Sequence, residues 1–275
     1  MKNRNKTVIE EFGDEWTTFN YSNISKKKLK QNFDEYFNIA PTIFFSDKSI
    51  GFDMGCGTGR WAQFIAPKVK HLNCIEPSNA IYVAKKNLKK YENISYYKET
   101  TETCTIKKGS QDFGYCLGVL HHIPNTEKAL YDCANLLKEN SPLLIYLYYN
   151  FENKPFWFKL LWMLSDYLRR LISQSPKPFK IFFCNLVSYL IYFPLSRISS
   201  FIEKLGINVE NIPLSEYRNK PFYQCRNDAL DRFGTRLEQR FSRDDITNML
   251  ENTGFKNIKF SSKPPYWCCV AFKKS

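Results

Sequence analysis

An acidic residue followed by three alternating glycines forms the most chemically suggestive segment of the chain. In the run IGFDMGCGTGRW, Asp53 ends an apolar stretch, and Gly55, Gly57 and Gly59 follow it. Glycines at a turn from strand to helix let the backbone approach a ligand closely, and the start of the helix offers free N–H groups and a positive dipole end. The segment therefore predicts a site for a nucleotide-type ligand.

The spacing around this loop disfavours a pyrophosphate group. The dinucleotide fingerprint requires its third glycine where this chain has Arg60, and the G-K-S/T of a phosphate-binding loop is absent. Beyond the loop, the run LNCIEPS places Glu76 at the expected end of the next strand, where a carboxylate can accept hydrogen bonds from both hydroxyls of a ribose. The sequence therefore favours a ligand with a single nucleoside over one with a pyrophosphate group.

Three motifs, D-x-G-C-G-T-G, E-P-S and D-F-x(4)-G-V-L-H-H-I-P, resemble those of the class I methyltransferases that use S-adenosyl-L-methionine. The resemblance runs from about Gly51 to Tyr149. It implies a transferase with S-adenosyl-L-methionine as cofactor and S-adenosyl-L-homocysteine as product. The glycine loop would surround the methionine moiety, and Glu76 would bind the ribose. The cofactor residues that the resemblance implies are Asp53, Gly55, Cys56, Gly57, Gly59, Glu76, Pro77, Glu99, Thr100 and Leu117.

The adenine contact departs from the family pattern. The acid that binds adenine in the family stands twelve residues before the Asp matched by Asp112, and here that position holds Thr100, flanked by Glu99. Either the Thr100 hydroxyl or the backbone would bind the exocyclic amine.

Two adjacent histidines and a tyrosine are the candidates for catalysis. His121 and His122, in the run LGVLHHIP after the expected fourth strand, could line the pocket, orient the substrate or take a proton near the ordinary imidazole pKa of ~6.5. The favoured alternative is that at least one of them packs under the cofactor. Tyr146 lies at the end of the fifth strand, where alternation places it on the face of Tyr148 and opposite Tyr149.

The elements that must position these residues follow from periodicity. Short apolar runs alternate with helical patterns from Ser49 onward, which is typical of a parallel sheet. Together with the resemblance, this pattern predicts the fold class: an α/β, seven-stranded, mainly parallel Rossmann-like sheet with a helical lid insertion between strands five and six. Strands are predicted at 49–54, 71–76, 93–97, 112–118 and 142–149, helices at 59–66, 78–90, 126–139 and 243–252, and two strands after the last helix.

This pattern divides the chain into four segments. Residues 1–40 are predicted to form an N-terminal helical cap, 41–149 the cofactor-binding Rossmann-like core, 150–240 the helical lid or substrate insertion, and 241–275 a helix and strands that complete the sheet.

The insertion admits two interpretations. Its helices could pack on one another and cover the active site, which we favour, or they could form an interfacial surface for membrane contact or an amphipathic lipid. The apolar run 181–195 has only fifteen residues, short of the ~20 that a spanning helix needs. The residues that would then face anionic headgroups are Lys154, Lys159, Arg169, Arg170, Lys177 and Lys180.

Arginines gather between 218 and 243, which holds six of the eleven in the chain. Many would form structural ion pairs. Alternatively, Arg226 or Arg232 could join Tyr223 in a clamp for a substrate carboxylate or phosphate.

The composition of the chain excludes some classes of protein. The 275 residues carry a net charge of +13, 43% are hydrophobic and the mean hydropathy is −0.43, which excludes a multi-pass membrane protein and a disordered chain. Nine cysteines without a C-x-x-C pair predict no metal site and a reducing, cytoplasmic location, and the N-terminus lacks an apolar signal region.

The predicted activity is methyl transfer to an oxygen, nitrogen or sulfur of a small-molecule or lipid-like acceptor. The basic charge also suits a tRNA or RNA methyltransferase, but dispersed lysines and the lack of an appended RNA-binding module make nucleic acid the less favoured partner. A non-catalytic protein that binds the cofactor is the other alternative. The oligomeric state cannot be read from the sequence.

Overall fold

The computed structural model describes residues 2–18, 25–209 and 211–275, and the chain divides into two compact units. We call Met1–Asn150 with Gln239–Ser275 the α/β unit, and Phe151–Glu238 the helical unit.

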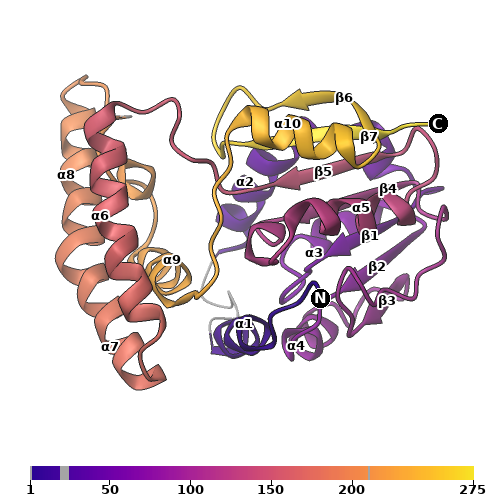
Figure 1. Cartoon of the computed structure of the whole chain (residues 1–275), viewed down its shortest axis with the longest axis horizontal. Helices are drawn as coiled ribbons and strands as arrows, with labels where there is room; N and C mark the ends of the chain where they lie inside the picture. Colours follow the sequence, from indigo (N-terminus) through magenta and orange to yellow (C-terminus); the bar gives the residue numbers. More distant parts are fainter. Residues whose placement is uncertain (1, 19–24, 210) are drawn as a thin grey trace. The chain divides into compact units, whose positions relative to one another are not determined.

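The α/β unit contains a sheet of seven strands in the order β3-β2-β1-β4-β5-β7-β6 (Figure 1). Strands β1 to β5 run parallel, and only β7 pairs antiparallel with its two neighbours. The predicted mainly parallel, Rossmann-like sheet is confirmed. The strands are β1 Ile50–Met54, β2 His71–Ile75, β3 Ile94–Tyr97, β4 Phe113–Leu117, β5 Pro142–Tyr146, β6 Phe255–Phe260 and β7 Cys268–Lys273.

Helices cover both faces of this sheet. One apolar cluster joins α2, α3 and α4 to one face, and a second joins α5 and α10 to the other. Figure 1 shows α5 and α10 in front of the sheet and α2 behind it. The helices of the unit are α1 Lys6–Thr18, α2 Lys26–Phe37, α3 Ala62–Ile65, α4 Ala80–Asn87, α5 Thr126–Leu136 and α10 Arg243–Asn252, with short 3-10 turns η1 Thr42–Phe45, η2 Ala66–Lys68 and η3 Leu120–His122.

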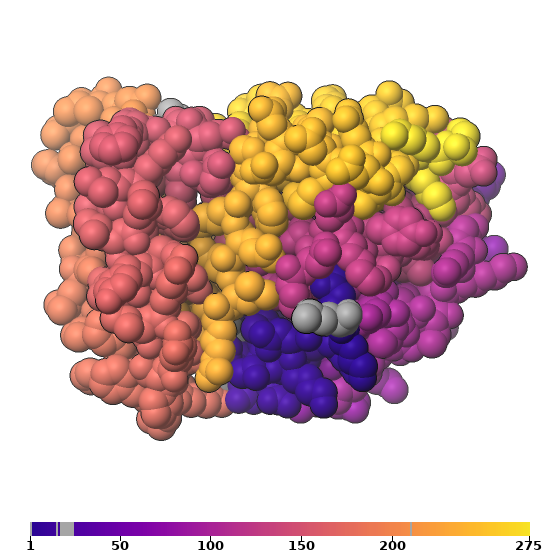
Figure 2. All heavy atoms as spheres, in the orientation of Figure 1, coloured from indigo at the N-terminus to yellow at the C-terminus, as the bar shows by residue number. Residues whose placement is uncertain are grey.

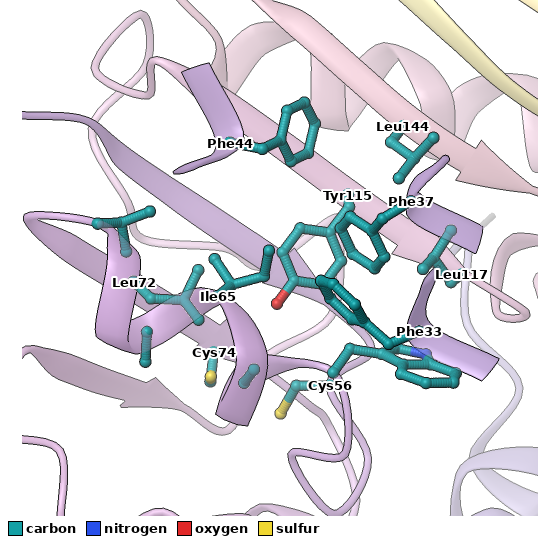
Figure 3. Close-up of a cluster of buried hydrophobic side chains, with 14 of the residues drawn as sticks. Phe33, Phe37, Phe44, Cys56, Ile65, Leu72, Cys74, Tyr115, Leu117 and Leu144 are labelled. Carbon is teal, nitrogen blue, oxygen red and sulfur yellow. The ribbon is translucent and has the colours of Figure 1, made fainter. Parts of the chain in front are cut away.

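Glycine and phenylalanine residues on β1 and β4 pack against one another and fix how closely the two strands approach. In the register of the two strands, Gly51 is opposite Phe113 and Phe52 is opposite Gly114. A Cβ at either glycine would lie 2.2 Å from the facing phenylalanine ring, so each glycine makes the space that its partner fills. Figure 3 shows the resulting core on the α2 side, where Tyr115 lies between Phe37, Phe44 and Ile65.

Some predicted elements are shorter in the structure. The helix predicted at 59–66 is reduced to α3, because the turn of the glycine loop continues through Trp61 and the 3-10 segment η2, which contains Pro67, begins at Ala66. The strand predicted at 142–149 ends at Tyr146, and only an isolated bridge from Tyr149 to Phe241 continues the pairing.

The insertion between β5 and β6 is helical, as predicted. It contains α6 Phe156–Ser173, α7 Lys177–Val187, the π-helix η4 Ser188–Tyr192, α8 Phe193–Lys204, η5 Ser215–Tyr217 and α9 Phe222–Gly234. Our length argument for this segment was wrong, because α7, η4 and α8 form one continuous helix, Lys177–Lys204, of 28 residues. By length and composition alone, this helix is long and apolar enough to cross a membrane.

Candidate functional site

The glycine loop lies between the carboxyl ends of β1 and β2, and its shape depends on glycine. Gly55, Gly57 and Gly59 all have positive φ angles, of 76°, 52° and 79°. A Cβ at Gly55 would lie 2.4 Å from the Val119 side chain, and one at Gly59 would lie 2.6 Å from Leu88. The N–H of Gly55 donates to the Ile75 carbonyl at 2.8 Å, which ties the loop to β2.

Gly57 differs from its two neighbours because the space beside it is open. A Cβ there would meet nothing closer than 3.8 Å, and the nearest atoms belong to the Trp16 indole of α1. Its N–H donates to Glu76 Oε2 at 3.1 Å. The tip of the loop is therefore bonded to Glu76, one of the two acidic residues that the sequence singled out.

Asp53 is buried at the end of β1 with an unsatisfied oxygen. Among the described residues, its Oδ2 has no hydrogen-bond partner. Burial raises the pKa of Asp53 to about 8; the Tyr115 hydroxyl opposes this rise, the Glu76 charge adds to it and the Arg60 charge opposes it. Tyr115, paired with Asp53 across β1 and β4, is close enough to lower the pKa but lacks hydrogen-bond geometry. A buried carboxyl in this state is suited to receive a cationic group.

Glu76 follows β2 and is also buried. Its Oε1 accepts a hydrogen bond from the Ser78 N–H at 3.0 Å, in addition to the Gly57 bond to Oε2. Burial raises the pKa of Glu76, although the hydrogen bonds from Ser78 and Gly57 lower it. Each oxygen keeps a lone pair that could accept from a ribose hydroxyl.

Asp53, Gly57 and Glu76 therefore form a contiguous site at the sheet edge where parallel α/β folds bind ligands. The orphaned Asp53 oxygen and the open space at Gly57 fit a nucleoside that carries a cationic amino-acid tail. S-adenosyl-L-methionine has this chemistry.

Three other residues predicted to bind the cofactor are Cys56, Pro77 and Leu117, and their surroundings differ. Cys56 is buried next to Cys74, and burial raises the pKa of its thiol. Pro77 lines a cavity of about 320 Å³ between α1 and the segment that follows Glu76. The Leu117 side chain ends β4 within the core cluster, which leaves its backbone as the part available for a ligand.

The two predicted adenine residues make hydrogen bonds within their own loop. Glu99 accepts from the backbone N–H and the hydroxyl of Thr105, at 2.7 and 2.8 Å. The Thr100 hydroxyl lies 3.1 Å from that of Thr103. Thr101 is instead the buried residue, and its hydroxyl has no hydrogen-bond partner among the described residues. The family spacing pointed to Thr100 and gave no signal for Thr101.

Helix α1 covers the glycine loop. Besides the Trp16 indole at Gly57, the Phe12 ring lies 4.7 Å from the His122 ring. Phe19 and Tyr21, two aromatic residues that follow this helix in the sequence, lie outside the described residues.

The two histidines form η3, after β4, and both are buried. The His121 ring stacks on Tyr148 with centroids 3.8 Å apart, and neither of its ring nitrogens has a hydrogen-bond partner among the described residues. Burial lowers the pKa of His121 well below its ordinary value, and the charges of His122 and Arg240 lower it further. His121 therefore stays neutral near pH 7, which corrects the idea that it exchanges a proton near pH 6.5.

Tyr146, the third catalytic candidate, ends β5 on the same side as Tyr148. Their rings are 5.9 Å apart, and the Tyr36 ring of α2 lies 5.2 Å from Tyr146. Tyr149 contacts Tyr266 and does not share in this group. The predicted alternation agrees with these contacts.

The predicted substrate residues Tyr223, Arg226 and Arg232 all lie on α9 of the helical unit. Tyr223 and Arg232 are nine residues apart, which places them on opposite sides of an α-helix. Arg232 donates to the Ser165 hydroxyl at 2.6 Å, a contact within the helical unit. The prediction of a clamp formed by Tyr223 and Arg232 is therefore wrong. Arg226, three residues after Tyr223, lies on the same side of α9 as Tyr223.

In residues 2–18, 25–209 and 211–275, no group of three or more His, Cys, Asp or Glu side chains could hold a metal ion.

Comparison with known proteins points to one activity class. A family model described as a methyltransferase domain matches residues 52–145. A curated ubiquinone biosynthesis O-methyltransferase from Glaesserella parasuis is 30% identical over 117 residues, which cover 40% of this chain and 49% of that protein. The chain thus spans about half the length of the curated relative that it matches.

Solved structures support the fold. A candidate methyltransferase from Bacillus halodurans is 13% identical, with 89% of this chain and all of that one covered and a TM-score of 0.53. A protein from Thermotoga maritima, described as a possible histamine N-methyltransferase, is 15% identical over 98% of this chain and 99% of that one, with a TM-score of 0.50.

Proposed function

We propose that this chain transfers a methyl group from S-adenosyl-L-methionine to an oxygen, nitrogen or sulfur atom of a small or lipid-like acceptor, because residues 52–145 match a family model described as a methyltransferase domain. The main support for this proposal is that the buried Oδ2 atom of Asp53 has no hydrogen-bond partner among the described residues, while the space beside Gly57 in the glycine loop is open. The likeness to a relative named as a ubiquinone O-methyltransferase supports a small, lipid-like acceptor.

The bound cofactor would supply an activated sulfonium methyl group. The residues of this chain would do the positioning. Asp53 would hold the positively charged amino-acid end, in a buried site where a cation favours the ionised carboxylate. Glu76 would accept from the ribose hydroxyls, and the buried Thr101 hydroxyl is our candidate for the adenine side.

The residues near the acceptor would orient it and exclude water. The buried His121 ring stacks on the half-buried Tyr148 ring beside β4 and β5, and the Arg240 guanidinium lies 5.1 Å from the Tyr148 ring centroid. Since the pKa of His121 is lowered, its role would be a neutral hydrogen-bonding or packing surface. Tyr146 and His122 remain candidate acceptor contacts on the same edge of the sheet.

Calorimetry with the purified full chain tests this proposal. We expect binding of S-adenosyl-L-methionine and S-adenosyl-L-homocysteine, with dissociation constants below about 1 mM. Gly57→Val should remove detectable binding, because the branched side chain fills the open space and opposes a φ of 52°. Glu76→Gln should weaken binding by roughly 10- to 100-fold through loss of a charged acceptor.

Two matched variants control for strain and charge. Gly109→Val also places valine at a glycine with positive φ, 63°, but in a loop away from the site, and should leave binding unchanged. Glu99→Gln removes an equivalent charge where the carboxylate bonds to Thr105, so its effect should be smaller than that of Glu76→Gln. No binding by the unaltered chain, or equal loss in Gly109→Val, would contradict the proposal.

A further inference from the structure

Helix α6 has its polar and apolar faces reversed relative to a helix of a water-soluble bundle. Its buried positions include Asp166, Arg169 and Ser173, spaced by three or four residues. Arg169 bonds to Asp166 Oδ1 at 2.6 Å and to the Thr235 carbonyl at 2.9 Å, both within the helical unit. The opposite positions are exposed and apolar: Phe156, Trp157, Leu160, Leu161, Met163, Leu164, Tyr167, Leu168 and Leu171.

The continuous helix Lys177–Lys204 repeats this reversal. Its inward positions include three serines, Ser188, Ser196 and Ser199, beside the apolar side chains of Cys184, Val187 and Tyr192. Ser188 donates to the Cys184 carbonyl at 2.7 Å, and Ser196 to the Phe193 carbonyl at 2.8 Å. Small, locally bonded residues between helices and large apolar residues outside are typical of helices that pack in an apolar solvent. The outward apolar positions are Phe179, Phe182, Leu186, Tyr189, Leu190, Ile191, Phe193, Ile198 and Phe201.

This exposed apolar surface is confined to one part of the chain. Among the described residues, every exposed large apolar side chain except Tyr82 and Tyr131 lies between Phe156 and Ile207. Figure 2 shows side chains of α6 on the surface along the whole helix. Contiguous exposed apolar area of this extent marks a binding surface.

The charge of this surface indicates what it binds. Residues 167–202 contain no Asp or Glu but five Lys or Arg, in a chain that has 27 acidic residues. Arg170 and Lys177 are exposed at the end of α6 and the start of α7, whereas Arg169 and Lys180 point inward and bond to carbonyl oxygens. Our expectation that Arg169 and Lys180 face headgroups was therefore wrong.

We propose that α6, α7 and α8 bind the surface of a lipid bilayer that contains anionic headgroups, with their outward apolar side chains in the interface. Large apolar residues beside exposed cations, with Trp157, Tyr167 and Tyr189 among them, match the two chemistries of an anionic bilayer surface. A protein partner would need matching acidic and apolar patches over three helices. The proposal is independent of methyl transfer.

Flotation of the full chain with vesicles tests it. We expect binding to vesicles of phosphatidylcholine and phosphatidylglycerol in equal parts, and weaker binding to phosphatidylcholine alone. The double variant Leu164→Glu/Phe201→Glu should lower the bound fraction at least about ten-fold, because it places two charges in the apolar interface. Both side chains are exposed, at 60% and 64%, so the fold should survive. Arg170→Glu/Lys177→Glu should abolish the preference for anionic lipid.

The matched control is Tyr82→Glu/Tyr131→Glu, which adds the same charge at the two exposed apolar positions of the α/β unit, 61% and 54% exposed. It should bind vesicles like the unaltered chain. Equal release by both double variants, or no flotation of the unaltered chain, would overturn the proposal. A dimer that Leu164→Glu/Phe201→Glu dissociates, without vesicle binding, would assign the surface to a second copy instead. Each result stands whether or not the chain binds S-adenosyl-L-methionine.

Discussion

The inward-facing positions of the two units differ in polarity. In the α/β unit, Phe52, Phe113 and Leu120 are fully buried between sheet and helices. The helical unit also has a buried apolar cluster, which includes Phe233, but α6, α7 and α8 bury serines and an ion pair and expose many leucines and phenylalanines. Burial of apolar area stabilises a unit in water. The contrast agrees with the proposal that α6, α7 and α8 lie against a lipid surface.

Matched phenylalanine truncations should give the largest difference between the units. Phe52→Ala should lower the free energy of unfolding by about 3–5 kcal/mol, since it leaves a cavity between β1 and α5. Phe201→Ala should change the free energy of unfolding by less than about 0.5 kcal/mol in water, because the side chain is exposed. Urea unfolding followed by circular dichroism measures both. A large cost for Phe201→Ala would show that another part of the chain covers α8 and would remove the contrast.

Removing the buried ion pair should have the next largest effect. Asp166→Ala leaves the inward Arg169 guanidinium without its carboxylate and should cost about 3 kcal/mol. Burial raises the pKa of Asp166, but the hydrogen bonds and charges of Arg169 and Arg170 outweigh it, so the net pKa is lowered. A lowered pKa means that this stability is present above about pH 4 and is lost as the pH falls further.

The readout for Asp166 is the unfolding midpoint of the helical unit between pH 3 and pH 7. The unaltered chain should lose stability on acidification in this range, and Asp166→Ala should lose less. An identical pH dependence in both proteins would contradict the assigned ion pair.

Asp53 should show the opposite pH dependence. Its folded pKa of about 8 lies above its ordinary value, so the folded α/β unit holds a proton that the unfolded chain releases above about pH 4. The free energy of unfolding should therefore fall as the pH rises from about 4 to about 8. Asp53→Asn should remove this slope and stabilise the cofactor-free chain near pH 8.

The same Asp53→Asn variant should bind S-adenosyl-L-methionine more weakly. In the unaltered chain, affinity should rise as the pH approaches 8, because the cation requires the ionised carboxylate. Calorimetry in two buffers of different ionisation enthalpy would detect the released proton. Binding without proton release, or a retained slope in Asp53→Asn, would assign the titration to another group.

The α/β fold could be predicted from sequence because each strand alternates or runs apolar in register with its neighbours. Phe52, Cys116 and Leu143 face one cluster, and Tyr115 and Leu144 face the other. Helix ends were harder to predict, because the turn of the glycine loop continues through Trp61 and delays the start of α3, which hydrophobic periodicity does not report.

The candidate site could be predicted only in part. The glycine loop and Glu76 are adjacent in the structure, since strand ends and turn glycines are local signals. The Thr101 hydroxyl, the Trp16 cover and the His121 stack on Tyr148 depend on burial, which spacing does not determine. The reversed polarity of α6 was also missed, because an abundance of apolar residues in a helix does not state which positions lie inward.

The position of α1 has a consequence for turnover. Its Trp16 and Phe12 side chains lie against Gly57 and His122. Under the proposed function, we expect exchange of spent for fresh cofactor to require movement of this N-terminal helix, and that movement would then contribute to the rate of turnover.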